Sequence, residues 1–494
     1  MVEMIELVKL VGEENVLDDA GVLEEYTRDM SFVRPISPRC VVKPKSAGEV
    51  QGIVKWANDT GTPLVPVSSG PPHFHGDTIP GTSIKGVVMV DLSRMRQIIR
   101  VDRRNRVVMI EPGVTFGELI PALEKEDLSP LMTLAPRSSK SVVTSFLERE
   151  PITKPRFHWE AMDPLLCTEV IYGSGDLFRT GSAGGPGTIE EQWKVGRAQA
   201  RGMGPSQVDF TRLLQAAQGT MGIITWATVK CIPLPKVKET YLVASENVER
   251  LIEFAYKILW KKLGEQCLIL NGLSLASIMA ADSERIKALR DKLPPWVLVY
   301  SIEGAGLLPR EKVDYQREES VEVAKSFGLA LKTTIPGIKA KDVSVALSQP
   351  SAEPYWKLRY KGGCQDIFFL TTMDKTPGFI KKVHELAGDY QYPLENIGVY
   401  IQPMVQGTNC HCEFELVYNP RVPGEAEKVR RFIIEGSQEL ADMGAFFSRP
   451  YGSWTSIAYA GNEQTAAGHR KLKNIFDPNW IMNPGKLCFG HAYD

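Results

Sequence analysis

The stretch SSGPPHFHGDTIP, residues 68–80, follows the apolar run TPLVPV at residues 62–67. It places adjacent prolines at 71–72 between Gly70 and Gly76. Proline fixes φ and removes an amide donor, whereas glycine lets the backbone approach a ligand closely. The apolar run is typical of a buried strand, and nucleotide or phosphate sites form at the carboxyl ends of strands in α/β folds. The stretch therefore indicates either a ligand-binding loop or an ordinary surface loop.

Length and composition are those of an ordinary globular protein. The chain has 494 residues, too many for one hydrophobic core, which predicts more than one domain. Hydrophobic residues make up 43% and charged residues 24%, and the net charge of −1 gives no basic footprint for nucleic acid. No apolar run reaches the roughly 18 residues of a membrane helix, and residues 1–16 are acidic and amphipathic, unlike a signal peptide. We therefore expect a cytoplasmic protein without a nucleic-acid partner or a transmembrane segment.

The cysteines are spaced as isolated thiols. They lie at positions 40, 167, 231, 267, 364, 410, 412 and 488, without the CxxC pairs or tight clusters of a zinc or iron–sulfur site. Cys410 and Cys412 flank His411 in what looks like a strand, where alternation sends both thiols to one face and the histidine to the other. This is poor geometry for a shared metal, so we expect reduced thiols and no metal site.

The pattern of apolar residues changes along the chain. From about residue 35 to 235, short strands alternate with helices. One of these helices places four apolar residues on a single face: Phe116, Leu119, Ile120 and Leu123. From about 240 to 450, longer helices alternate with strands, which predicts an α+β second domain, and a short tail begins at residue 451.

Six segments, in this order, resemble the flavin-binding fold of the vanillyl-alcohol oxidase and para-cresol methylhydroxylase (PCMH) superfamily. They are PKSAGEVQGIVKWANDTGTPLVPV (44–67), VVMVDLSRM (87–95), VMIEPGVTFGEL (108–119), TEVIYGSGDLFRTG (168–181), QGTMGIITWATVK (218–230) and FDPNWIMNPGK (476–486). The resemblance spans most of the chain and implies an α+β fold in which a PCMH-type FAD-binding domain carries an α+β cap. It implies an FAD-binding domain at 1–240, a cap or substrate domain at 241–450, and a segment at 451–494 that returns to the FAD site.

Two further blocks favour the phenol-oxidising branch of this superfamily. Residues 141–170 and 397–420 are similar to segments of that branch. The branch that oxidises 2-hydroxy acids is expected to carry a GDGNLH-like stretch with a metal-ligand histidine, and QGTNCHCEF at 406–414 matches it only loosely.

The resemblance gives the loop at 68–80 a role. In this family the loop wraps the FAD pyrophosphate with backbone amides, which neutralise the phosphate charges. The implied loop contacts are Ser68, Ser69, Gly70, Pro71, Pro72, His73, Phe74, His75, Gly76 and Asp77. The other implied FAD contacts are Pro136, Ser138, Ser139, Ser141, Gly219, Gly222, Ile223, Ile224, Asn483 and Lys486.

The mode of flavin attachment is a separate question. Some family members link the flavin to a histidine in this loop, which makes His73 and His75 candidates, but a solvated or phosphate-contacting imidazole is the favoured interpretation of each. In the phenol oxidases the link comes from the second domain, where GGCQDIFFL aligns Asp366 with the attaching residue. Aspartate does not fit that role, so we predict non-covalent FAD.

Two sites are implied for the chemistry. An acidic residue lies close to the flavin in the phenol oxidases, and the segment PRFHWEAMD places Glu160 there, with His158 as the substitute. A carboxylate near a flavin acts as acid or base when its pKa is raised. The alternatives are a surface carboxylate and a core histidine.

The second site is GAFFSRPYGSW at 444–454. It keeps the phenolate-binding arginine as Arg449, whereas Ser448 takes the place of the partner tyrosine and Tyr451 lies two residues downstream. A guanidinium stabilises a phenolate, an enolate or a carboxylate, and the alternative is a structural arginine between the domains. A basic and aromatic run ranks below Arg449 as a candidate for the same cavity: Trp356, Lys357, Arg359, Tyr360 and Lys361.

These residues support two functional hypotheses. The first is an FAD-dependent oxidoreductase that takes hydride from an aromatic alcohol, an alkylphenol or a hydroxy acid onto flavin N5. The second is an electron-transfer flavoprotein subunit with a vestigial pocket, which passes electrons to a redox partner. Candidate acceptors are oxygen, a quinone, or an iron–sulfur or cytochrome protein, and a homodimer is compatible with the sequence. Glu160 and Arg449 favour the enzyme.

Overall fold

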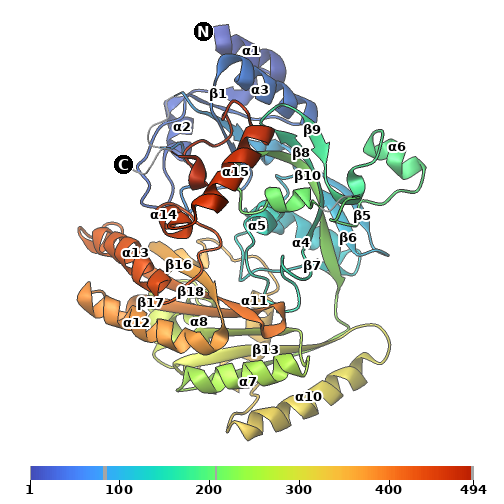
Figure 1. The fold of residues 1–494 in the computed structure, drawn as a ribbon. Coiled ribbons are helices and arrows are strands. Elements are labelled where there is room, and N and C mark those ends of the chain that lie inside the picture. Colours follow the sequence, from blue (N-terminus) through green and yellow to red (C-terminus); the bar gives the residue numbers. More distant parts are fainter. Residues whose placement is uncertain (1, 82–85, 206–207, 491–494) are drawn as a thin grey trace.

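The computed structural model describes residues 2–81, 86–205 and 208–490. The chain forms an upper domain that contains the first and the last described residues and a lower domain built from residues 237–442 (Figure 1). The upper domain begins with a four-stranded sheet in the order β1-β2-β4-β3. Its strands are β1 (Val16–Leu17), β2 (Cys40–Val42), β4 (Val88–Asp91) and β3 (Leu64–Val67). β2, β4 and β3 are parallel, so the predicted ligand loop leaves the carboxyl end of a parallel strand.

Helix α3 (Ala47–Thr60) crosses between two of these parallel strands. It begins at Ser46, whose side chain accepts a hydrogen bond from the Glu49 amide, and ends at Gly61, which adopts the left-handed conformation at φ 65°. Its buried residues recur at helical spacing: Val50, Ile53, Val54, Trp56 and Ala57. This face packs on the sheet and holds β3 in place.

The second sheet of the upper domain is antiparallel and has six strands. They are β5 (Ile98–Asp102), β6 (Val107–Ile110), β10 (Gly222–Pro233), β8 (Leu165–Tyr172), β9 (Leu177–Arg179) and β7 (Leu128–Pro130). Helix α4 (Phe116–Glu124) buries the four apolar residues that the sequence places on one face. The alternation of strands and helices expected for residues 35–235 therefore divides into a small parallel sheet and a larger antiparallel one.

The lower domain is one antiparallel sheet between two layers of helices. Its strand order is β11 (Val237–Ser245), β13 (Trp296–Gly304), β12 (Gln266–Asn271), β17 (Ile397–Met404), β18 (Asn409–Tyr418) and β16 (Gly363–Thr371). One face packs on α7 (Val248–Trp260), α10 (Pro309–Ser326), α12 (Thr376–Asp389) and α13 (Glu425–Asp442). The other packs on α8 (Gly272–Met279), α9 (Ser283–Arg290) and α11 (Ala340–Ala346).

Strand β18 shows how this sheet separates its two faces. Cys410 and Cys412 lie in the core under α7, α12 and α13, whereas His411 and Glu413 point to the opposite face. The alternation predicted for the two thiols and the histidine is therefore present. All eight cysteines are buried and free, and among the described residues no group of three or more His, Cys, Asp or Glu side chains could hold a metal ion.

The end of the chain packs against the upper domain. Helix α15 (Glu463–Phe476) lies beside β8 and β9, and Met482 forms a parallel bridge with Leu64 of β3 (Figure 1). The fully buried Lys473 on α15 donates to the carbonyl oxygens of Thr220 and Met482. These contacts bring residues 473–483 next to the strands that carry the ligand loop.

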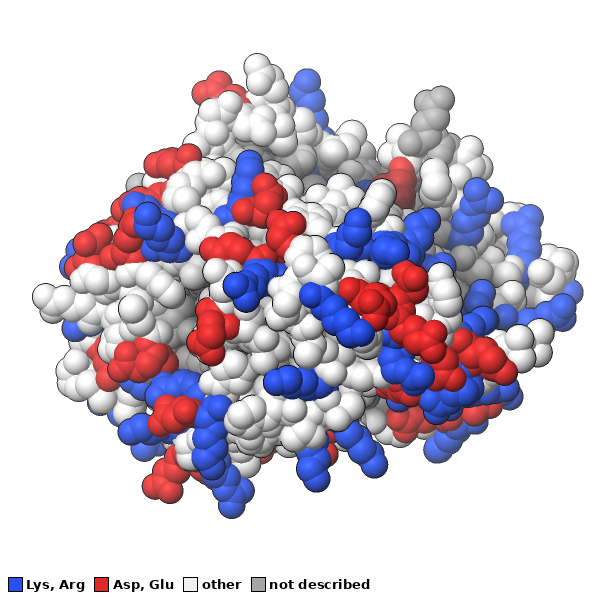
Figure 2. All heavy atoms as spheres, turned by 90° about the horizontal axis from the view of Figure 1, so that it is seen from below, with Lys and Arg blue, Asp and Glu red and all other residues white. Residues whose placement is uncertain are grey.

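The outer face of the lower domain carries both signs of charge. Figure 2 shows Lys and Arg side chains interspersed with Asp and Glu over this face, so it presents no field of a single sign. Within the described ranges, no helix is long and apolar enough to cross a membrane.

Candidate active site

A large cavity lies between the two domains. It contains about 1700 Å³ of space free of protein atoms, counted out to the opening to solvent. The upper domain contributes the loop after β3, helix α5 (Val142–Leu147) with its flanking residues, and the start of β10. The lower domain contributes β16, β17 and β18, and the chain after α13 adds Arg449 and Tyr451. A cavity at the interface of two domains is a common place for a cofactor or substrate site.

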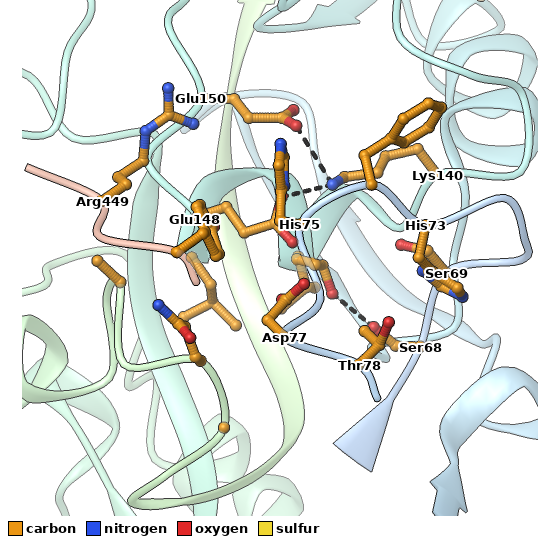
Figure 3. A pocket seen from close by; sticks show the side chains of 18 of the residues that line it. Ser68, Ser69, His73, His75, Asp77, Thr78, Lys140, Glu148, Glu150 and Arg449 are labelled. Carbon is orange, nitrogen blue, oxygen red and sulfur yellow. Dashed lines mark hydrogen bonds and ion pairs between the residues drawn. The ribbon is translucent and has the colours of Figure 1, made fainter. Parts of the chain in front are cut away.

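The loop after β3 lines the cavity with part of the predicted set (Figure 3). The residues that face the cavity are Ser68, Ser69, His73, Phe74, His75, Asp77 and Thr78. Gly70, Pro71, Pro72 and Gly76 are not among the lining residues. The Gly70 amide donates to Ser139 O (3.0 Å), and its carbonyl accepts from Arg137 (2.7 Å).

Gly76 holds the loop where only glycine fits. It has φ +75°, and a Cβ there would lie 2.4 Å from a Val33 methyl carbon. Its amide donates to Asp29 Oδ2 (2.7 Å) and its carbonyl accepts from Lys486 Nζ (2.7 Å). The close approach expected for this glycine is therefore to other parts of the chain.

The predicted serines support the loop from behind. Pro136 lines the cavity, whereas Ser138, Ser139 and Ser141 do not. The Ser141 amide donates to Ser69 Oγ (3.0 Å), and the Ser141 hydroxyl donates to Pro112 O (2.6 Å). These bonds orient the Ser69 hydroxyl at the cavity wall.

Of the other predicted cofactor residues, some line the cavity and some lie behind its wall. Gly219, Gly222, Ile223 and Ile224 line the cavity. Asn483 lies behind the wall and donates to Asp77 O (2.8 Å) and to Gln218 O (2.6 Å). Asn483 and Lys486 thus connect the end of the chain to the loop instead of facing the cavity.

Two features test whether the wall fits a phosphate-bearing cofactor. The Thr78 hydroxyl is buried at the wall and has no hydrogen-bond partner within the described ranges, so it is free for a ligand. Gly222 at the start of β10 also lines the wall, and a Cβ there would lie 2.5 Å from Ile171 O, so glycine is needed for the close approach of β10 to β8. The free Thr78 hydroxyl fits a hydrogen-bonding group of a ligand, such as a phosphate oxygen.

Sequence reasoning missed a buried ionic group in the same wall. Lys140 Nζ contacts Glu148 (2.5 Å) and Glu150 (3.2 Å) (Figure 3). Ser145 also donates a hydrogen bond to Glu150. Burial raises the pKa of Glu148 to about 7, against the opposing effect of Lys140. Burial alone would lower the pKa of Lys140, but the two carboxylates outweigh it and raise that pKa. In the sequence these two acids stand in the run LEREP, near the predicted cofactor contacts. The charge pattern of this run does not by itself show that the acids line a cavity.

Arg449 and Tyr451 both reach the cavity. The Arg449 side chain is 7% exposed, its guanidinium carbon lies 4.1 Å from the centre of the Phe368 ring, and within the described chain it makes no hydrogen bond or ion pair. Tyr451 stacks on His75 with ring centres 4.5 Å apart. Burial, with Lys140 and Arg449 nearby, lowers the pKa of His75 to about 3, so its imidazole is neutral. The result is an aromatic wall beside a buried cation that forms no ion pair with the described residues.

Glu160 and His158 do not line the cavity. Glu160 keeps a third of its side chain exposed and accepts a hydrogen bond from Asn409 Nδ2 (2.9 Å) at the edge between the domains. His158 is buried and its Nδ1 accepts from the Glu160 amide (3.4 Å). Burial, reinforced by Arg449, lowers the pKa of His158 to about 3. The acids that line the cavity in this part of the chain are Glu148 and Glu150, which precede Glu160 by 12 and 10 residues.

The lower domain supplies a second charged group. From the predicted basic and aromatic run, Trp356 and Lys357 line the cavity, whereas Arg359, Tyr360 and Lys361 do not. Lys357 Nζ contacts Asp366 Oδ2 (2.6 Å) and Glu413 Oε1 (2.5 Å). The residue that aligns with a flavin-attaching position is thus held in an ion pair.

We expect replacement of Lys486 by methionine to weaken FAD binding by about tenfold to a hundredfold. The Lys486 ammonium donates to the Gly76 carbonyl, and a hydrogen bond to a charged group contributes about 1.5–3 kcal/mol. Titration of apoprotein with FAD, followed by flavin fluorescence, measures the change. Lys471→Met on the exposed side of α15 is the matched control, and an unchanged dissociation constant in Lys486→Met would contradict the prediction.

Comparison with known proteins identifies the cofactor. Residues 38–143 match the family described as FAD binding domain, and residues 451–487 match the family described as FAD linked oxidases, C-terminal domain. The chain is 23% identical to the 4-cresol dehydrogenase (hydroxylating) flavoprotein subunit of Pseudomonas putida, over 97% of this chain and 93% of that protein. It is 25% identical to a glycolate oxidase subunit of Bacillus subtilis, over 98% and 96% of the two chains.

Among solved structures, p-cresol methylhydroxylase with substrate bound superposes with a TM-score of 0.80 at 18% identity, covering 100% of this chain and 97% of the other. The α+β fold, the FAD cofactor and the FAD-linked oxidoreductase class expected from the sequence are therefore confirmed.

Proposed function

This chain belongs to the superfamily of PCMH-type FAD-linked oxidases, and we propose that it takes a hydride from a small substrate whose oxygen is held as an anion by Arg449. The observation that carries the proposal is a buried guanidinium that faces the cavity and makes no hydrogen bond or ion pair with the described residues. Burying a charge without a partner is costly, so such a group indicates that an anion is supplied by a ligand.

FAD, when bound, supplies the acceptor for the hydride. The loop after β3 and the start of β10 would hold the cofactor, and His75, Tyr451 and Phe368 form the adjacent aromatic wall. A fixed cation favours the anion from which hydride leaves most readily. An aromatic alcohol, an alkylphenol and a hydroxy acid all present such an oxygen, and the relatives act on both a cresol and a hydroxy acid according to their names.

We propose Glu148 as the group that accepts the substrate proton. It lines the cavity near Arg449 and His75 (Figure 3), and its pKa of about 7 suits a general base at neutral pH. Because the base must be ionised, we expect the rate of flavin reduction to rise as the pH increases through about 7. Stopped-flow measurement against pH tests this. Glu148→Gln should remove the rise, and a variant that keeps the wild-type pH profile would contradict the assignment.

We propose that FAD is bound without a covalent link. Asp366 is engaged by Lys357, and His73 and His75 belong to a loop held by backbone contacts. We expect acid or detergent to release all of the flavin from purified protein. Recovery of flavin on a peptide that contains His73 or His75 after digestion would contradict this.

Anaerobic mixing with a panel of phenols, benzylic alcohols and 2-hydroxy acids tests the reaction itself. Bleaching of the flavin absorbance by a member of the panel is the expected result. The relative named as a flavoprotein subunit favours a second candidate, an electron-transfer subunit that serves a separate protein or a quinone. Flavin that no substrate bleaches, but that a redox partner reduces or oxidises, would favour that candidate.

A further inference from the structure

We propose that Lys357, Asp366 and Glu413 form a subsite for an uncharged hydroxyl group of the substrate. The proposal rests on the proposed function, because it places this hydroxyl on the same molecule whose anionic oxygen Arg449 holds. It narrows the substrate class to compounds that carry both groups.

The three side chains come from separate parts of the lower domain. Lys357 lies in a short helical turn (Trp356–Leu358), Asp366 in β16 and Glu413 in β18, and all three line the cavity. Each side chain is about nine-tenths buried, so the exposed remainder faces the cavity. Their positions follow from pairing, because Glu413 lies opposite Phe368 of β16, two residues from Asp366.

The hydrogen bonds fix the group and leave one donor free. Lys357 Nζ uses two of its three N–H donors on Asp366 and Glu413. Glu413 Oε2 accepts from His411 Nε2 (2.7 Å), which orients this carboxylate. Burial alone would lower the pKa of Lys357, but the adjacent carboxylates outweigh it and raise that pKa well above its usual range, so the ammonium stays charged. The third N–H of Lys357 has no partner among the described residues, and neither has the Tyr355 hydroxyl on the same wall.

The arrangement of charges selects the chemistry of the ligand group. A ligand carboxylate or phosphate would be repelled by Asp366 and Glu413, and a ligand ammonium would be repelled by Lys357. An apolar group would leave the free ammonium N–H desolvated and unpaired. A hydroxyl accepts from the ammonium and donates to a carboxylate lone pair, so it satisfies both. Sites that hydrogen-bond a substrate hydroxyl discriminate strongly against analogues that lack it.

The test is ligand binding to the FAD-loaded protein, which needs no turnover. The probes are benzoate, its three hydroxy isomers and the corresponding methoxy compounds, with dissociation constants taken from the perturbation of flavin absorbance. We expect at least one hydroxy isomer to bind about tenfold or more tightly than benzoate, and methylation to abolish this advantage. Benzamide and its hydroxy isomers are measured in parallel, because they do not depend on Arg449.

The variants separate a subsite from a merely structural cluster. Lys357→Met/Asp366→Asn removes one charge of each sign and should reduce the hydroxyl advantage to less than about threefold, with benzoate itself bound as before. Glu413→Gln is the second variant and should reduce the same ratio. Lys361→Met, whose lysine pairs with Glu425 outside the cavity, is the control.

Each outcome bears on one proposal. A wild-type protein with no preference for any hydroxy isomer, or variants that keep the preference, would overturn the subsite. If the wild-type protein does not bind benzoate but prefers a hydroxybenzamide to benzamide, the result counts against Arg449 as the anion site and supports the subsite.

Discussion

Replacement of Arg449 by alanine should slow reduction of the bound FAD by substrate by on the order of 10²-fold or more, with fold and flavin content unchanged. The guanidinium is 7% exposed, faces the cavity, and makes no hydrogen bond or ion pair with the described residues, so its N–H donors are free for the substrate anion. The stabilisation of the anion grows as the hydride leaves. Removing the guanidinium should therefore lower the rate of flavin reduction. Anaerobic stopped-flow absorbance with the best substrate of the panel measures the rate.

Two control variants test whether the effect is specific to the Arg449 guanidinium. Arg449→Lys should recover only part of the rate, because the ammonium lacks the planar fork of the guanidinium. Arg430→Ala on the outer side of α13 should reduce flavin at the wild-type rate. If Arg449→Ala instead loses FAD while its remaining flavin is reduced at full speed, Arg449 is a structural bridge and the electron-transfer candidate gains support.

Replacement of Lys473 by methionine should destabilise the protein by about 3–5 kcal/mol. Lys473 and Asp477 form an ion pair with both side chains fully buried (2.5 Å). The same ammonium holds the carbonyl oxygens of Thr220 and Met482, and removing it leaves the Asp477 carboxylate buried without a cation. Denaturant unfolding of the holoprotein, followed by far-UV circular dichroism and flavin release, measures the loss.

The double variant Lys473→Met/Asp477→Asn distinguishes the charge effect from the loss of packing. It should be more stable than Lys473→Met, because the uncompensated charge is gone while the asparagine oxygen still accepts from the Ile481 amide. Lys471→Met on the exposed face of the same helix should leave the unfolding midpoint unchanged. A double variant as unstable as the single one would show that the stability comes from the carbonyl contacts instead.

Some of the site residues could be predicted from the sequence, and others could not. Arg449 and Tyr451 were placed at the cavity by their neighbours in the chain, and both line it. Glu160 was chosen by counting along an irregular segment, and the structure places it at the edge between the domains. Nothing local distinguishes its carboxylate from that of Glu148, because both stand in polar loops between the same two buried elements.

The sequence by itself predicted the elements and the position of the loop, because glycine and proline positions, helical spacing and strand alternation are local properties, and the resemblance of six segments implied the cofactor-binding fold. It also predicted that His411 lies on the face of its strand opposite to Cys410 and Cys412. Only the tertiary structure decided that this face forms a cavity wall and that Lys357 meets Asp366 and Glu413 there. The physical reason is that strand pairing across many residues, and the packing of one domain on the other, set which charges become neighbours, and no local pattern encodes that choice.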